Sequence, residues 1–108
     1  MTKEDMIKCL QDIEWENFEV KKAEIAIPRN SWETVSAFAN TGGGWLVFGV
    51  SQKEQDFKIT GVNNPEKIEQ DFVTTLRSNQ KFNVRIDPIC KKYEIADKTV
   101  LAFNIPVS

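Results

Sequence analysis

Residues 36–50 read Ser-Ala-Phe-Ala-Asn-Thr-Gly-Gly-Gly-Trp-Leu-Val-Phe-Gly-Val, an amphipathic segment that stops at three glycines and restarts as a continuous apolar run. Before the glycines, apolar side chains recur three and four residues apart, which is the period of a helix: Trp32, Val35, Phe38 and Ala39. After them, Trp45–Val50 is short, aromatic and β-branched, as is typical of a strand covered on both faces. The stretch therefore predicts a helix, a tight turn and a buried central strand.

The turn itself carries three glycines, Gly42, Gly43 and Gly44, which is more than the end of a helix requires. One residue with positive φ suffices there, and we expect Gly42 to provide it. Each further glycine loses backbone entropy on folding, so the surplus predicts that something approaches this backbone closely. A mononucleotide P-loop is excluded, because such a loop opens a helix whereas this one follows a helix.

Asn40 and Thr41 stand directly before the glycines. Their side chains suit hydrogen bonds to the phosphate or sugar of a nucleic acid that contacts the glycine backbone. Helix capping and turn formation explain the same two residues equally well, so both interpretations stay open.

The length and composition are those of an ordinary globular domain: 108 residues, 41% hydrophobic and 28% charged. We expect a single domain over residues 1–108. Because the sequence ends directly after a predicted strand, we expect this domain to be the N-terminal part of a longer protein. No apolar run approaches the roughly 18 residues of a membrane span, and no secretory signal opens the chain. These features predict a cytoplasmic protein without membrane contact.

Catalytic chemistry is restricted by the absence of histidine. Imidazole acid–base catalysis, serine triads with a histidine base and nearly all zinc chemistry are thereby excluded. Cys9 and Cys90 are too few and too far apart for a metal motif or a disulfide framework. Carboxylates and lysines are left as catalytic groups, and we expect neither a metal nor a cofactor.

Three helices are expected. Residues 3–12 place Met6, Ile7 and Leu10 at helical spacing. Asn30 precedes the second helix, with Glu33 in the capping-box position. The third helix starts with a cap, a proline and an acid at Asn64, Pro65 and Glu66, and its buried stripe comprises Ile68, Phe72, Val73 and Leu76.

Strands are expected around the central one. Phe18–Lys21 alternates, and Phe57–Val62 follows the central strand as its hairpin partner. Val84–Ile95 and Thr99–Val107 form an antiparallel hairpin through residues 96–98, and the second of them exposes an edge.

A charged group surrounds the first of these strands, where Glu19 and Lys21 share the face opposite Phe18. Glu14 lies just ahead, where a turn could bring it back toward them. Two carboxylates with a lysine are a possible site for a divalent cation and a phosphate. An ion pair on a solvated sheet face explains the same residues.

Charge is unevenly distributed along the chain. The formal net charge is −2, yet residues 77–98 hold six basic and three acidic residues, so this segment carries +3 and the remainder −5. Lys91 and Lys92 lie within it and could attract phosphate, although a solvated face of mixed charge accounts for the same pattern.

Taken together, the charged strand and the glycine stretch resemble the Schlafen AlbA-2 domain. The similarity rests on four segments of residues 14–62 and on the closing strand: Glu14, Glu19 and Lys21; Ser36–Gly44; Phe48–Val50; Ile59–Val62; and Val100–Ser108. The resemblance implies an α+β domain with a mixed, mainly antiparallel sheet and about three helices. Such domains often stand at the N-terminus of bacterial transcriptional regulators, ahead of an ATPase or winged-helix module, and DNA binding is the usual proposal.

In the animal Schlafen branch, the resemblance implies an RNA-cleaving site of two glutamates and an aspartate. Glu14 and Glu19 match the glutamates and Lys21 the motif lysine, whereas Ser51 and Gln52 stand where the aspartate is expected. Neither residue supplies an anionic oxygen. Glu54 or Asp56 would replace it only if the hairpin bent back.

The sequence thus favours a nucleic-acid-binding module, with DNA preferred over RNA. The expected contact residues are Lys21, Lys22, Asn40, Thr41, Gly42, Gly43, Gly44, Lys91 and Lys92. One alternative is a non-catalytic interaction domain that docks on its own ATPase module or forms a homodimer through the edge of Thr99–Val107. Another is a metal-dependent endoribonuclease that uses Glu14, Glu19 and Lys21.

Overall fold

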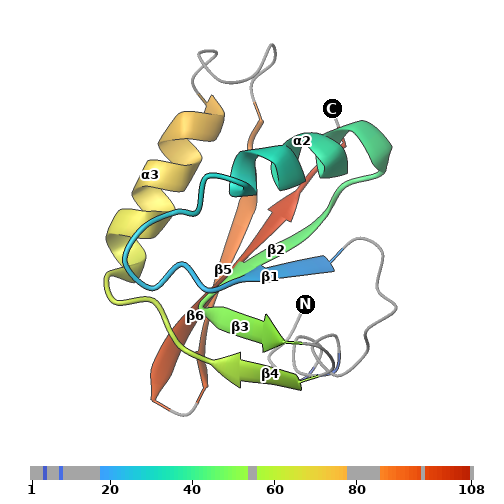
Figure 1. Cartoon of the computed structure of the whole chain (residues 1–108). Coiled ribbons are helices and arrows are strands. Elements are labelled where there is room, and N and C mark those ends of the chain that lie inside the picture. Colours follow the sequence, from blue (N-terminus) through green and yellow to red (C-terminus); the bar gives the residue numbers. More distant parts are fainter. Residues whose placement is uncertain are drawn as a thin grey trace.

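The computed structural model describes residues Glu4 and Lys8 and the ranges 18–53, 56–77, 86–95 and 97–107 (Figure 1). A four-stranded sheet in the order β1-β2-β6-β5 forms the centre, and a separate hairpin pairs β3 with β4. The strands are β1 (Phe18–Lys21), β2 (Gly44–Phe48), β3 (Val50–Lys53), β4 (Asp56–Ile59), β5 (Ile89–Ile95) and β6 (Lys98–Ile105). The helices of the described residues are α2 (Ser31–Thr41) and α3 (Pro65–Arg77).

The sheet is mixed and mainly antiparallel, which confirms the predicted α+β class. β1 runs parallel to β2, with α2 as the connection between them, whereas β2–β6 and β5–β6 are antiparallel. Two helices, rather than about three, are present in the described part of the chain; the helix expected over residues 3–12 lies largely outside it. Neither α2 nor α3 is long and apolar enough to cross a membrane.

Both faces of the central strand are buried, as the run Trp45–Val50 predicts. On one face, Leu46 and Phe48 join β6 and the helices in the main core, where the Phe72 ring of α3 lies 4.3 Å from Phe103 and 5.2 Å from Phe48 between centroids. On the other face, a smaller cluster connects β2 and β6 to the β3–β4 hairpin: Val47, Val50, Val100 and Ala102. The helices and the small hairpin therefore cover opposite faces of β2.

The predicted pairing of Phe57–Val62 with the central strand is wrong. β2 ends at Phe48, the chain bends at Gly49 with φ +102°, and β4 pairs with β3 in the register Val50↔Ile59. A Cβ on Gly49 would lie 3.2 Å from the carbonyl oxygen of Thr99 in β6, so the bend leaves little room for a side chain. Because of this bend, the second half of the apolar run belongs to another sheet.

The two helix starts differ from one another. Asn64 caps α3 as predicted, since its Oδ1 accepts a bond of 3.3 Å from the backbone N–H of Lys67. Asn30 makes no side-chain capping bond, and its φ and ψ of −72° and −3° are helical, so the predicted capping box with Glu33 does not form. A helical backbone at the cap aims the side chain away from the first N–H groups.

The C-terminal hairpin forms as predicted, with Ile95 opposite Lys98 and Asp97 at φ +64° in the turn. Its second strand, however, is not an edge. β6 lies between β2 and β5, so the expected exposed edge at Thr99–Val107 is wrong and β5 occupies that position.

Candidate nucleic-acid interface

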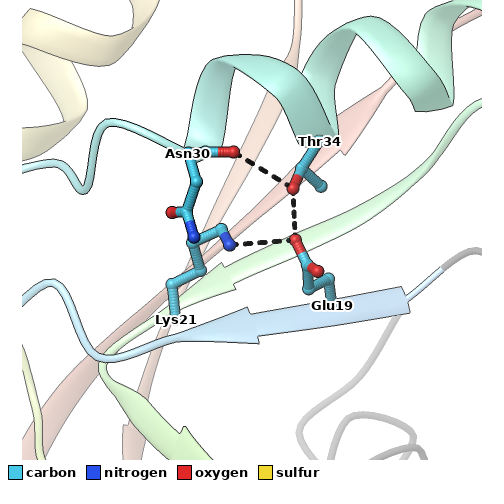
Figure 2. A network of polar contacts seen from close by, with 4 residues as sticks. All are labelled: Glu19, Lys21, Asn30 and Thr34. Carbon is cyan, nitrogen blue, oxygen red and sulfur yellow. Dashed lines mark hydrogen bonds and ion pairs between the residues drawn. The ribbon is translucent and has the colours of Figure 1, made fainter.

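Glu19, Lys21 and Thr34 form a compact polar cluster beneath α2 (Figure 2). Glu19 lies opposite Leu46 in the β1–β2 register and so faces the helix layer, which agrees with the predicted separation from Phe18. Its Oε2 accepts a hydrogen bond from the Thr34 hydroxyl and lies 3.1 Å from the Lys21 Nζ. The Thr34 hydroxyl also lies 3.4 Å from the backbone oxygen of Asn30, and this ties the helix start to the strand.

Burial determines what this cluster can do. The Lys21 side chain is 11% exposed and the Glu19 side chain 44% exposed. The ammonium of Lys21 is therefore committed to an internal partner in a poorly solvated position, where a lone charge is costly. Lys21 positions Glu19 and is badly placed to meet a phosphate from solvent.

The described residues do not fit a divalent-cation site of the Schlafen type. One oxygen of Glu19 already accepts from an ammonium and a hydroxyl, and a neighbouring cation opposes a metal. Ser51 and Gln52 lie on β3 and bring no carboxylate, and no group of three potential metal ligands exists within the part of the chain that the structure describes. Glu14 and Glu54 lie outside that part, as does the side chain of Asp56.

The close approach predicted at the glycines comes from the end of β6 in the same chain. Gly43 has φ +80°, and a Cβ there would lie 2.6 Å from the carbonyl oxygen of Ile105. Gly42, expected to be left-handed, instead has φ 165° and ψ 9°, and no atom lies within 4 Å of the place that a Cβ would take. The backbone amides of both glycines bond to the Phe38 oxygen, at 3.2 and 2.6 Å, and Gly44 starts β2. This turn joins α2 to the sheet.

Asn40 and Thr41 are engaged within α2. The Thr41 hydroxyl donates to the Ala37 carbonyl at 2.7 Å, and the Asn40 amide nitrogen lies 3.5 Å from the Ser36 hydroxyl. Both residues are exposed. These contacts match the interpretation of the two residues as helix-terminal polar groups.

The predicted lysines do not converge on one place. Lys21 ends β1 and Lys22 follows it, whereas Lys91 and Lys92 belong to β5. Within the described residues, β1 and β5 are the two outer strands of the sheet. Three strand spacings separate them, which is roughly 14 Å. Lys22 pairs loosely with Glu24 at 3.5 Å and its side chain stays 64% exposed.

Lys92 belongs to a second polar cluster, between β5 and α3. Its Nζ lies 2.9 Å from the Glu69 carboxylate. The hydrogen bond from Lys92 lowers the pKa of Glu69, and the same bond raises the pKa of Lys92. Burial, and then the hydrogen bond to Glu69, raise the pKa of the Cys90 thiol to about 12, so the thiol stays protonated at neutral pH. Cys90 is thus a poor nucleophile.

Thr34 and Glu69 were not predicted as site residues from the sequence. Each lies on a helix and contacts a predicted strand residue: Thr34 contacts Glu19, and Glu69 contacts Lys92. Thr34 stands beside the buried positions of α2, and Glu69 beside those of α3. That placement is a signal for a side chain turned toward the sheet, but it does not say which strand residue the side chain meets.

Comparison with known proteins adds the family. The model of the Schlafen, AlbA_2 family matches residues 14–108. Among solved structures, the N-terminal domain of an ATP-dependent DNA helicase RecG-related protein from Nitrosomonas europaea superposes with a TM-score of 0.79 at 26% identity, over 96% of this chain and 72% of that one. The DIP2311 protein from Corynebacterium diphtheriae matches at 18% identity and a TM-score of 0.48, over 86% of this chain and 21% of that one. The fold, the charged strand and the family match over nearly the whole chain lead to one conclusion: the chain belongs to the Schlafen AlbA_2 family.

Proposed function

We propose that this chain is a nucleic-acid-binding module, with DNA preferred, of a larger cytoplasmic bacterial regulator. The observation that carries the proposal is the structural likeness to the N-terminal domain of a protein whose name relates it to a DNA helicase. Membership of the AlbA_2 family supports the same nucleic-acid-related role. A downstream ATPase or winged-helix module is part of this proposal.

The contact surface is proposed from exposure. Lys21 and Lys92 are held in ion pairs at 3.1 and 2.9 Å, and the Lys21 side chain is only 11% exposed. Lys22 and Lys91 are exposed, one after β1 and the other on the sheet face away from the helices, where Lys91 lies opposite Ala102. These two lysines are our candidates for phosphate contacts, and Lys21 acts behind them as a positioning residue.

The expected affinity is weak. Two phosphate contacts give a slope of log K against log salt near −1.8, which is roughly a tenfold loss between about 50 and 200 mM salt. The net charge of −2 opposes binding further, so we expect micromolar or poorer affinity at low salt, which several modules acting together would raise.

Fluorescence anisotropy on labelled duplex DNA, single-stranded DNA and RNA, at several salt concentrations, tests this. Lys22→Ala with Lys91→Ala should weaken binding and flatten the salt slope. The matched control, Lys58→Ala with Lys67→Ala, removes the same charge at two other exposed positions and should keep a slope near that of the wild type. No binding at low salt, or equal losses in both variants, would favour a protein-interaction domain.

We propose further that the domain is not a nuclease. The carboxylate of Glu19 is occupied by Lys21 and Thr34, and Ser51 and Gln52 replace the third acid. Incubation of structured RNA with Mg²⁺ or Mn²⁺ should give no cleavage above that of a Glu14→Ala, Glu19→Ala variant. Cleavage that this variant loses would establish the endoribonuclease alternative.

A further inference from the structure

β5 is an outer strand of the sheet within the described residues, with β6 on its inner side. Its seven residues alternate between the two faces: Cys90 lies opposite Phe103 of the main core, and Tyr93 lies opposite Val100 of the smaller cluster. An outer strand of this length carries backbone groups that can pair with another strand.

The direction of those backbone groups follows from a bond on the far side of β6. The carbonyl oxygen of Thr99 accepts from the Val62 N–H at 2.9 Å, so it points away from β5. In an antiparallel ladder, opposite residues either exchange both bonds or turn both sets of groups outward. Glu94, which lies opposite Thr99, therefore presents its N–H and C=O at the open side of β5. By alternation, Lys92 and Cys90 do the same.

A cavity of about 440 Å³ lies between α3 and the start of β5, lined by α3 residues between Glu66 and Arg77 together with Pro88 and Cys90. α3 reaches β5 through the Glu69–Lys92 ion pair.

We propose that β5 pairs with β5 of a second copy, in an antiparallel register with Tyr93 opposite Tyr93 on the two-fold axis. This register places Lys92 opposite Glu94 of the partner copy, and Glu94 opposite the partner's Lys92. Both residues present outward backbone groups, so each pair exchanges two backbone bonds. Each pair also joins opposite charges on the helix face, because the Lys92 ammonium has three N–H donors and can bond the partner's Glu94 besides Glu69. The two four-stranded sheets become one continuous sheet. This inference is independent of nucleic-acid binding.

Charge selects this register over its neighbours. An axis at Lys91 or Lys92 would put two ammonium groups opposite one another, and an axis at Glu94 would do the same with two carboxylates. Like charges directly opposite one another destabilise strand pairing. Among axes on these four residues, Tyr93 alone gives two attractive pairs and no repulsive one, so β5 is complementary to a copy of itself.

Sedimentation of the whole chain, without nucleic acid and over a range of concentrations, tests the proposal. We expect a monomer–dimer equilibrium. Glu94→Lys turns two attractive pairs into repulsive ones and should raise the dissociation constant roughly tenfold or more. The matched control Glu33→Lys makes the same charge change at an exposed position of α2 and should leave the equilibrium unchanged.

Two further variants test the pairing itself. Glu94→Pro removes an outward N–H and leaves the β5–β6 ladder intact, so the chain should stay folded by circular dichroism and become monomeric. The Lys92→Glu variant alone should also be monomeric. When it is mixed with the Glu94→Lys variant, the two proteins should form a mixed dimer, because each Glu then lies opposite a Lys.

The register has its own readout. With Cys9 and Cys90 replaced by serine, Tyr93→Cys should oxidise to a disulfide-linked dimer, because paired Cα atoms on the axis lie about 4.5 Å apart. Ile89→Cys in the same background should not, since the two copies of residue 89 lie roughly 27 Å apart. A chain that stays monomeric up to about millimolar concentration overturns the proposal and leaves the edge to a strand of another protein. A dimer indifferent to Glu94→Pro overturns it as well.

Discussion

The glycine turn at Gly43 and the charged cluster around Glu19 both stand out in the sequence as candidate contact sites, and both lie next to β1 or β2. They differ in what they contact. Gly43 meets the carbonyl oxygen of Ile105, so its lack of a side chain is explained within the fold. Glu19 is 44% exposed and reaches solvent beside a lysine that is only 11% exposed. The close contact at Gly43 is made within the protein, whereas the Glu19 side chain remains partly exposed to solvent.

The sharpest test of this contrast is Gly43→Ala. The new Cβ would lie 2.6 Å from a backbone oxygen at a φ of +80°, so we expect a loss of about 2–4 kcal/mol in the free energy of unfolding. Gly42→Ala is the control, since no atom lies within 4 Å of the place that its Cβ would take, and it should cost about 1 kcal/mol or less. Urea denaturation measures both. Equal losses would mean that the turn is held by something other than this contact.

Glu19→Ala should have the next largest effect. It leaves the Lys21 ammonium, 11% exposed, without its carboxylate, and we expect a loss of about 2 kcal/mol. Glu24→Ala removes the carboxylate of the neighbouring pair with Lys22, whose side chain is 64% exposed, and should cost about 0.5 kcal/mol or less. If thermal denaturation gave the two variants the same stability, the Glu19 cluster would be no more than a surface pair.

A smaller effect on stability is expected when both members of the Glu19–Lys21 ion pair are replaced together. Glu19→Ala combined with Lys21→Met removes both charges and keeps the apolar stem, so the double variant should recover about 1 kcal/mol relative to Glu19→Ala alone. The comparison requires unfolding curves of both single variants and the double one. A double variant less stable than Glu19→Ala would contradict the cost assigned to the unpaired ammonium.

The smallest effect is expected at Glu69, whose pKa is lowered by Lys92. A lowered pKa in the folded state contributes stability above the unfolded pKa, near 4.5, and that contribution is lost as pH falls through the folded pKa. The difference in denaturation midpoint between the wild type and Glu69→Gln should therefore be fully present at pH 7 and shrink as the pH falls below about 4.5. Glu66→Gln serves as control, and a difference that does not shrink would point to packing instead.

Local elements could be predicted from the sequence because short-range patterns determine them. The helical spacing before the glycines gave α2, the Asn-Pro-Glu start gave α3, and the apolar run gave β2. The alternation in β1 placed Glu19 and Lys21 on one face. One interpretation of this alternation placed Glu19 and Lys21 on a solvated face. In the structure α2 covers that face, because β1, α2 and β2 form one parallel β-α-β unit.

Long-range relations were not predictable in the same way. The order of strands puts β6 inside the sheet, and no local pattern encodes which strands are neighbours. Thr34 reaches Glu19 across fifteen residues of sequence, and the partner of Gly43 is Ile105. The glycines signalled close contact correctly, but nothing beside them in the sequence identified the end of β6 as the contact.

The interior position of β6 delays the assembly of the domain. β2 ends at residue 48, yet its antiparallel neighbour is complete only at Ile105. At synthesis rates of about 5–20 residues per second, roughly 3–12 seconds pass between the two. During that interval the apolar strand β2 has one side of its backbone unpaired, which is the condition in which nascent chains aggregate or recruit chaperones. The synthesis of β6 therefore ends this exposure of β2.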